Sequence, residues 1–273
     1  MIKNKKIITP RSESFLTYIK KVWQYKGLAL SFAKRDIQVK YAQTFLGVAW
    51  SIIQPVIILS LYTFFFGYIL KWKSGNIPFP LYVFSGLIGW NLFQSIVIQG
   101  TNSLVESSMI IKKIYFPRFI LQIGKVIISL IDLAISFALL LILLIIYGEM
   151  PSYKLIFLPF IIILNIICGL TFSVWISALS FRFRDLNQVV PLIMTVGIWV
   201  TPAFFTFDIL PKNLQFIWTM NPMTGIIESW RWCLFDEWKL SIRFFYSIFF
   251  LIPLLISGIW VYSKNENIFS DYS

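Results

Sequence analysis

Long uncharged and mostly apolar runs alternate with short polar segments along this chain. A helix needs roughly 20 apolar residues to cross the hydrocarbon core of a bilayer. The third run, 133–148, reaches that length if it extends back to about residue 119 and includes Lys125 and Asp132. The pattern therefore predicts six transmembrane helices within 41–263, over residues 41–70, 74–105, 119–148, 155–181, 186–207 and 244–263.

The first 40 residues form a separate polar region with one amphipathic stretch. Its apolar residues recur at helical spacing, and lysines fall on the opposite face. This pattern predicts an interface helix on the inner membrane surface, and a helix packed against the protein's own loops fits equally well. The apolar positions are Phe15, Leu16, Ile19, Val22 and Trp23.

The amino-acid composition indicates that lipid surrounds much of the chain. Of its 273 residues, 58% are hydrophobic and only 13% are charged, which is far from the composition of a soluble domain. Polar residues are too few to cover a water-exposed surface of this size. We therefore expect an all-α membrane protein.

The basic residues are unevenly divided between the two sides of the predicted membrane domain. Of the 24 lysines and arginines, sixteen lie in 1–40, in the loops after the second and fourth runs, and in the tail 264–273, against seven on the other side. Cytoplasmic loops carry the excess of Lys and Arg. Both termini are therefore predicted to be cytoplasmic, and the net charge of +12 indicates orientation rather than nucleic-acid binding.

The sequence offers little material for catalysis. It contains no histidine, which removes the commonest general base and metal ligand. Cys168 and Cys233 form no CxxC motif, so no metal site is expected. The stretch "QIGKVI" has a Gly-Lys pair but lacks the remaining residues of a phosphate-binding loop. The chain is thus not expected to be an enzyme or to hydrolyse ATP.

Lys125 and Asp132 are the charged residues inside a predicted span. They lie seven residues apart, on one face of a helix, and a structural or interfacial role for the pair is favoured over proton coupling. A stand-alone flippase or secondary transporter should show more intramembrane charge and an internal repeat. A membrane enzyme should offer a histidine or a paired-acid metal site, so both alternatives lack their signals.

Five stretches carry a resemblance to a known family. In order and spacing they resemble permease subunits of ABC transporters that export polysaccharides, and most closely the O-antigen exporters of the Wzm type. Teichoic acid and capsule exporters are related but fit less well. The stretches are "RDIQVKYAQTFLGVAWSIIQPVI" from Arg35, "FPLYVFSGLIGWNLF" from Phe79, "NSLVESSMIIKKIYFPR" from Asn102, "LSFRFRDLNQVVP" from Leu179 and "NPMTGIIESWRW" from Asn221.

The resemblance implies a homodimer that pairs with two ATP-binding subunits, which hold ATP and Mg²⁺, while this chain carries no cofactor. The substrate would be a glycan linked to undecaprenyl diphosphate, moved across the bacterial inner membrane. The loop 106–118 would couple the chain to the ATPase, with aromatic and apolar anchors in a pocket of the partner. Its candidate residues are Lys112, Lys113, Ile114, Tyr115, Phe116, Pro117 and Arg118.

The resemblance also implies short re-entrant helices in the periplasmic segment 207–238, before the last span. Glu228 and Arg231 lie three residues apart there and are predicted to pair on one helical face. Aromatic faces suit the C–H faces of sugars, although packing and interface roles are commoner for such residues. The candidates for lining the glycan path are Tyr62, Phe65, Tyr68, Trp90, Trp199 and Phe204.

Three arginines are candidates for binding the lipid diphosphate at its point of access. Arg35 precedes the first span, and Arg182 and Arg184 lie between the fourth and fifth, which the resemblance places face to face at a side opening. The planar guanidinium donates two hydrogen bonds at once to a phosphate. Anchoring of the helix ends is the alternative, because Asp36 and Asp185 are neighbouring salt-bridge partners.

Overall fold

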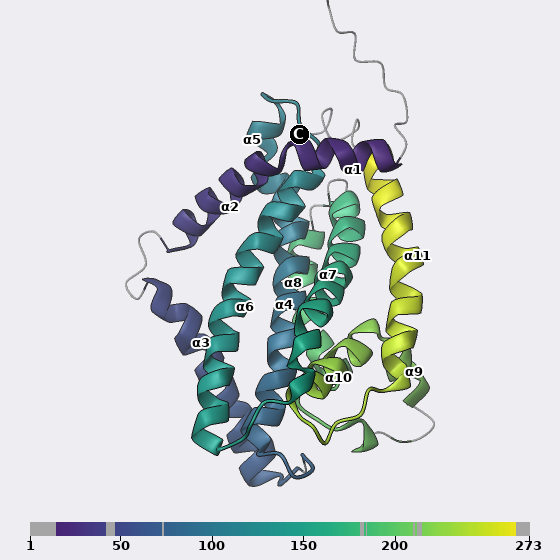
Figure 1. The fold of residues 1–273 in the computed structure, drawn as a ribbon. Coiled ribbons are helices and arrows are strands. Elements are labelled where there is room, and N and C mark those ends of the chain that lie inside the picture. The colour runs from purple at the N-terminus through teal and green to yellow at the C-terminus, as the bar shows by residue number, and fades with distance from the viewer. Residues whose placement is uncertain are drawn as a thin grey trace, which may run out of the picture.

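The computed structural model describes residues 15–41, 47–72, 74–180, 183, 185–209, 211 and 215–265. Across these residues the chain is helical and contains no β-strand. The helices run side by side as a bundle, and shorter helices cover both of its ends (Figure 1). The all-α prediction is therefore confirmed for the described part of the chain.

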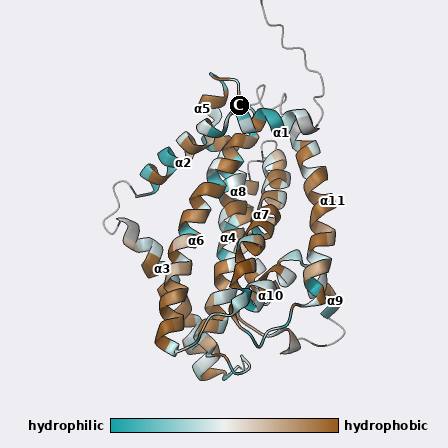
Figure 2. Cartoon of the chain, viewed as in Figure 1, coloured by the Kyte–Doolittle hydropathy of each residue, from teal (hydrophilic) through white to brown (hydrophobic). Residues whose placement is uncertain are grey.

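Within the described residues, five helices are long and apolar enough to cross a membrane. Apolar residues cover most of their length, whereas polar residues concentrate at α1 and α2 (Figure 2). The five are α3 (Trp50–Tyr62) with its continuation η2 (Thr63–Ile69), α4 (Phe79–Glu106), α6 (Phe119–Tyr147), α7 (Leu158–Ser180) preceded by η3 (Tyr153–Phe157), and α11 (Ile242–Asn265).

The fifth predicted run, 186–207, gives a shorter helix than its apolar length indicates. Helix α8 (Leu186–Gly197) and η4 (Ile198–Val200) together are shorter than the other candidates, at roughly 22 Å against a hydrocarbon core of about 30 Å. The helix ends because Thr201 takes an extended backbone. Residues 201–205 then turn back and are buried.

Two N-terminal helices, α1 (Phe15–Gln24) and α2 (Lys26–Tyr41), lie across one end of the bundle, together with α5 (Ser108–Ile111) (Figure 1). Helix α1 confirms the helix predicted there. Its Tyr18 and Val22 are buried in an apolar cluster with Phe32 of α2 and Phe116, whereas Trp23 is 70% exposed. Packing on the protein's own loops, one of the two interpretations of this helix, is therefore observed.

Helix α4 forms the centre of the bundle and packs on α6, α7 and α10. Its glycines allow close approach: a Cβ at Gly100 would lie 1.9 Å from Ser173 Oγ. Polar side chains also join the helices. The Gln122 amide donates to the Gly100 carbonyl at 2.9 Å, and the Asn165 amide donates to the Gly89 carbonyl at 2.9 Å.

The far end of the bundle carries η5 (Phe207–Ile209), α9 (Gln215–Met220) and α10 (Pro222–Leu234). Asn221 caps α10 by accepting from the Met223 amide at 3.0 Å, and proline follows at the first helical position, where its missing N–H costs nothing. Helix α10 is buried against α4, α7 and α11. Short helices thus precede the last long helix, as predicted.

Candidate functional site

The predicted coupling loop presents one exposed patch at the end of the bundle where α1 and α5 lie. The side chains of Lys112 and Lys113 are exposed, and Ile114 and Tyr115 are 58% and 60% exposed. Lys21 of α1 places its ammonium 5.5 Å from the centre of the Tyr115 ring. We call these four exposed loop residues the coupling surface.

The structure corrects part of the predicted anchor set. Phe116 is only 3% exposed, because its ring packs 5.6 Å from that of Phe32 within the cluster beneath α1 and α2. Pro117 and Arg118 are also buried. These three residues hold the loop to the bundle, so Ile114 and Tyr115 remain as the apolar anchors that a partner could reach.

Lys125 and Asp132 do not pair with each other, and each instead binds α2. Lys125 lies 2.8 Å from Asp36 and 2.7 Å from Glu106, while Lys40 lies 2.6 Å from Asp132. These contacts fasten α2 along α6. Burial would raise the pKa of Asp36, but hydrogen bonds and charge from Lys125 and Arg35 outweigh it, so the pKa lies below its usual value.

Of the three arginines predicted at the diphosphate, the structure describes Arg35 alone, because Arg182 and Arg184 lie outside the described residues. The Arg35 guanidinium lies 2.6 Å from Asp36 and 5.3 Å from the centre of the Phe32 ring. Its side chain is 39% exposed. The geometry therefore contains both the anchoring contact and a partly accessible guanidinium.

A polar cleft, which the sequence analysis did not anticipate, lies between α3, α4 and α6. It has a volume of about 430 Å³. Lys40 and Asp132 stand among its lining residues, near the end where α2 joins α3. We define the polar cleft by its amide and hydroxyl side chains, Ser51, Gln54, Asn91, Gln94, Ser95, Gln99, Ser129 and Ser136.

A second hollow of about 530 Å³ follows between the same three helices, toward their opposite ends. Its lining is mostly apolar, including Leu59, Phe64, Phe84, Leu139 and Leu143.

The signal for the polar cleft was present in the sequence, since residues 91, 95 and 99 repeat every four positions on α4. Counting charges alone missed it, because amides and hydroxyls are neutral.

The six aromatic path candidates divide into three groups. Tyr62, Trp199 and Phe204 come together, with the Tyr62 and Phe204 rings 4.9 Å apart and the Trp199 and Phe204 rings 5.0 Å apart. Phe65 and Tyr68 stand on the outer side of η2, 51% and 76% exposed. Trp90 stands apart from both groups and is buried within the protomer at 3% exposure; like Phe204 of the first group, which is 1% exposed, it packs inside the protomer.

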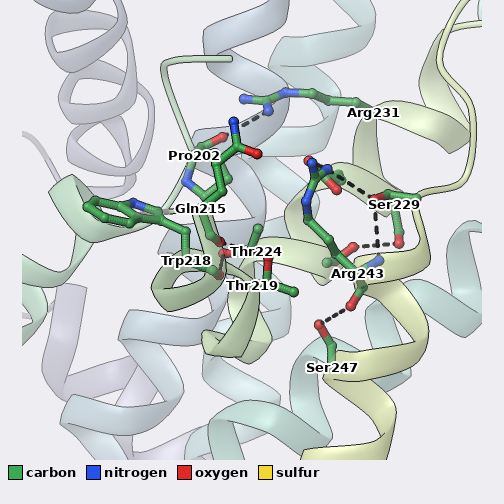
Figure 3. A network of polar contacts seen from close by, with 12 residues as sticks. Pro202, Gln215, Trp218, Thr219, Thr224, Ser229, Arg231, Arg243 and Ser247 are labelled. Atoms are coloured by element: carbon green, nitrogen blue, oxygen red, sulfur yellow. Dashed lines mark hydrogen bonds and ion pairs between the residues drawn. The ribbon is translucent and has the colours of Figure 1, made fainter. Parts of the chain in front are cut away.

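The predicted Glu228–Arg231 pair is wrong, because each side chain finds a different partner. Glu228 lies 2.7 Å from Arg243 of α11. Arg231 donates to the carbonyl oxygens of Pro202 and Ala203 at 2.8 and 2.6 Å (Figure 3). Its guanidinium also stacks 3.7 Å from the centre of the Tyr82 ring. The carbonyl groups after η4 have no donor within a helix, which explains why Arg231 bonds to them rather than to Glu228.

Metal binding and thiol chemistry find no site in the described residues. No group of three or more acidic, histidine or cysteine side chains gathers there to hold a metal ion. Cys168 and Cys233 are free and buried.

Comparison with known proteins identifies the class. Residues 28–235 match the family model for the ABC-2 type transporter, and the chain belongs to this family. It is a membrane permease of this class of transporter.

Three relatives span most of this chain. The O-antigen export system permease protein RfbA of Myxococcus xanthus is 25% identical over 225 residues, 81% of this chain and 85% of that protein. The protein of the same name from Klebsiella pneumoniae is 27% identical over 246 residues, which are 89% of this chain and 94% of that protein. The polysialic acid transport protein KpsM of Escherichia coli is 22% identical over 240 residues, which are 85% of this chain and 91% of that protein.

Proposed function

We propose that the chain is the permease of an ABC transporter that exports O-antigen, or a related polysaccharide, carried on undecaprenyl diphosphate. The similarity to O-antigen export permeases over most of the chain supports this proposal. Capsular polysaccharide is the second candidate, because a polysialic acid transport protein is similar over 85% of this chain. Restoration of surface glycan in strains that lack one or the other permease separates the two.

The proposed assembly is a homodimer bound to two ATP-binding-cassette subunits, which hold ATP and Mg²⁺. The coupling surface is the observation that carries this part. Ile114 and Tyr115 are apolar and exposed among lysines at the same end of the bundle, and aromatic anchors of this kind contribute much of the free energy of binding at protein interfaces.

The coupling surface is tested with a double variant, Ile114→Ala with Tyr115→Ala, in the complete transporter. We expect at least a tenfold loss of glycan export and reduced recovery of the ATPase subunit with the permease. Tyr153→Ala with Ile156→Ala is the matched control, since these residues are 81% and 79% exposed at the opposite end. Normal export and normal complex yield in the first variant would refute the coupling role.

We further propose six spans in the bacterial inner membrane, with α8 as the short fifth span and both termini in the cytoplasm. The excess of basic residues at the α1 end supports this orientation. The loops expected outside do lie together, since the Asn76 amide donates to Glu237 at 3.1 Å. A cysteine at Asn76 should react with an impermeant thiol reagent in spheroplasts, and one at Lys112 should not. The reverse pattern would overturn the orientation.

Arg35 remains our proposed contact for the lipid diphosphate, with Arg182 and Arg184 as further candidates. The partial exposure of its guanidinium supports the proposal. Arg→Lys at each position keeps the charge that orients the helices but removes the two-pronged hydrogen bond. We expect reduced export with unchanged insertion, whereas normal export in all three variants would identify these residues as anchors only.

A further inference from the structure

The polar cleft is unusual for its position within a membrane domain. Its walls come from α3, α4 and α6, three helices long and apolar enough to cross the bilayer. Polar groups that face hydrocarbon without a hydrogen-bond partner each cost several kcal/mol. A cluster of amides and hydroxyls at this depth therefore requires water or a polar ligand in the cleft.

Part of the cleft's hydrogen-bonding capacity is already used within the protein. Ser95 and Ser129 share a hydrogen bond of 2.8 Å across α4 and α6, and the Gln99 amide donates to Ser95 at 2.6 Å. By contrast, Gln54, Asn91 and Gln94 line the cleft and make no hydrogen bond with any described residue. Their amides hold both donors and acceptors ready for a ligand.

The chemistry of the lining favours hydroxyl groups over phosphate. Its single pair of charges consists of Lys40 and Asp132, which lie 2.6 Å apart and neutralise each other. A phosphate would call for cationic partners such as arginine, whereas the neutral amides and hydroxyls can donate to and accept from a sugar hydroxyl. The volume of about 430 Å³ falls within the range of sites that hold small organic ligands.

Building on the proposed function, we infer that the polar cleft binds neutral sugar residues of the exported glycan, with Gln54, Asn91 and Gln94 as the main contacts. The second hollow along the same helices is mostly apolar, so it offers a sugar chain few polar contacts straight on between them. The cleft is therefore a holding site, with Lys40 of α2 among its lining residues. The glycan must leave it sideways to cross the membrane.

Helix α3 is the wall of the cleft that the rest of the protomer buries least. In the most apolar stretch of α3 with η2, only 6% of the residues are buried inside the protomer, compared with 78% in the corresponding stretch of α4. The wall formed by α4 and α6 is fixed by the Ser95–Ser129 bond and by close helix packing. A shift of α3 would open or close the cleft while the opposite wall keeps its shape.

The first test places a photo-crosslinking amino acid at Gln94 in the complete transporter, in cells that make the glycan. We expect a glycan adduct at Gln94 and none at Ile145, which is 80% exposed on α6 outside the cleft. The adduct should vanish in cells unable to make the glycan. An adduct with phospholipid alone, or no adduct, would overturn the inference.

The second test removes the free amides while keeping their shape, with Asn91→Leu and Gln94→Met together. We expect at least a tenfold fall in glycan export, with normal yield of the complex and normal ATP hydrolysis. Asn102→Leu on the same helix, outside the cleft, is the matched control and should export normally.

The outcomes separate the two proposals. If the wild-type chain restores export to a permease-deficient strain but the double variant also exports normally, the cleft has no role in sugar binding and the proposed function stands. If the wild-type chain restores export of neither O-antigen nor capsule, the proposed function fails, and the assignment of the cleft fails with it.

Discussion

Helices α3 and α4 are neighbours of similar composition, yet they relate to the protein in opposite ways. Most residues in the apolar stretch of α4 are buried in the protomer, whereas almost no residues in the apolar stretch of α3 are buried. Glycines let α4 approach its neighbours closely, and polar side chains bond it to α6 and α7. Helix α3 exposes large side chains such as Ile57, Leu61 and Phe64 instead.

This difference shows that apolar composition does not measure how firmly a membrane helix is held. Lipid is as apolar as leucine, so association between helices depends on close packing and hydrogen bonds rather than on escape from water. Helix α4 has both, whereas α3 depends on lipid or on a second copy of the chain to cover it. Within the protomer, α4 is therefore the more firmly packed of the two helices and α3 the less firmly packed.

The largest effect should follow from removing Arg231, the arginine of α10 that holds residues 201–205 and stacks on Tyr82 of α4. Arg231→Met leaves the Pro202 and Ala203 carbonyls without their donor and removes the contact with Tyr82. We expect a loss of about 3 kcal/mol or more, since hydrogen bonds to charged groups contribute roughly 1.5–3 kcal/mol each. Melting temperature in detergent measures it, and Lys239→Met, an exposed position nearby, is the control. Equal melting temperatures would contradict the role of Arg231.

A smaller but still clear loss is expected from crowding α4. Gly100→Ala would bring a methyl group 1.9 Å from Ser173 Oγ and 2.3 Å from Gln122 Oε1, and such overpacking costs about 1–3 kcal/mol. Gly27→Ala on α2 is the matched control, because a Cβ there meets nothing within 4 Å. The same melting measurement applies, and a neutral Gly100→Ala would mean that α4 is less tightly held than its packing indicates.

The ion pairs between α2 and α6 should contribute about 1 kcal/mol, near the upper end for pairs that keep contact with solvent. The pKa of Asp36 lies below the usual value of 3.8. Its stabilisation is therefore present above that value and is lost as pH falls toward the folded pKa. Wild type should melt higher than Asp36→Asn at pH 7, and the difference should shrink as pH falls below 3.8 and disappear once pH is below the folded pKa. A constant difference at every pH would exclude the Asp36 carboxylate as the cause.

The smallest effect should be seen on α3. Leu61 is 52% exposed, so Leu61→Ala should change the stability of the purified protomer by less than about 0.5 kcal/mol. A loss as large as that of Gly100→Ala would show that a second copy covers this face in solution. Size-exclusion chromatography of both variants distinguishes a weakened dimer from a weakened protomer.

Most of the helical plan could be predicted from the sequence, because apolar runs of sufficient length leave few alternatives in lipid. Helix α6 begins at Phe119, as the extended third run predicted. The run 186–207 predicts a longer helix than the one that forms, because Ala203, Phe204 and Phe205 are apolar and buried but not helical. Apolar character alone does not distinguish a buried turn from another turn of helix.

The candidate site was predicted only where local chemistry decides the outcome. The exposed basic loop follows from its lysines, but Tyr115 points outward and Phe116 inward because Phe32, far away in sequence, receives the second ring. Glu228 likewise meets Arg243 across two helices rather than its neighbour in sequence. Contacts of this kind depend on how helices pack, which helical spacing within one segment does not specify.

The burial of both native cysteines has a practical consequence for observing α3. Paired spin labels on introduced cysteines report distances between two points of a molecule, provided that no other thiol is labelled. Cys168 and Cys233 are shielded inside the bundle, so the natural chain is already a suitable background. One label at Leu61 on α3 and one at Tyr153 before α7, both exposed, would measure whether the distance between α3 and the start of α7 changes when the partner ATPase hydrolyses ATP.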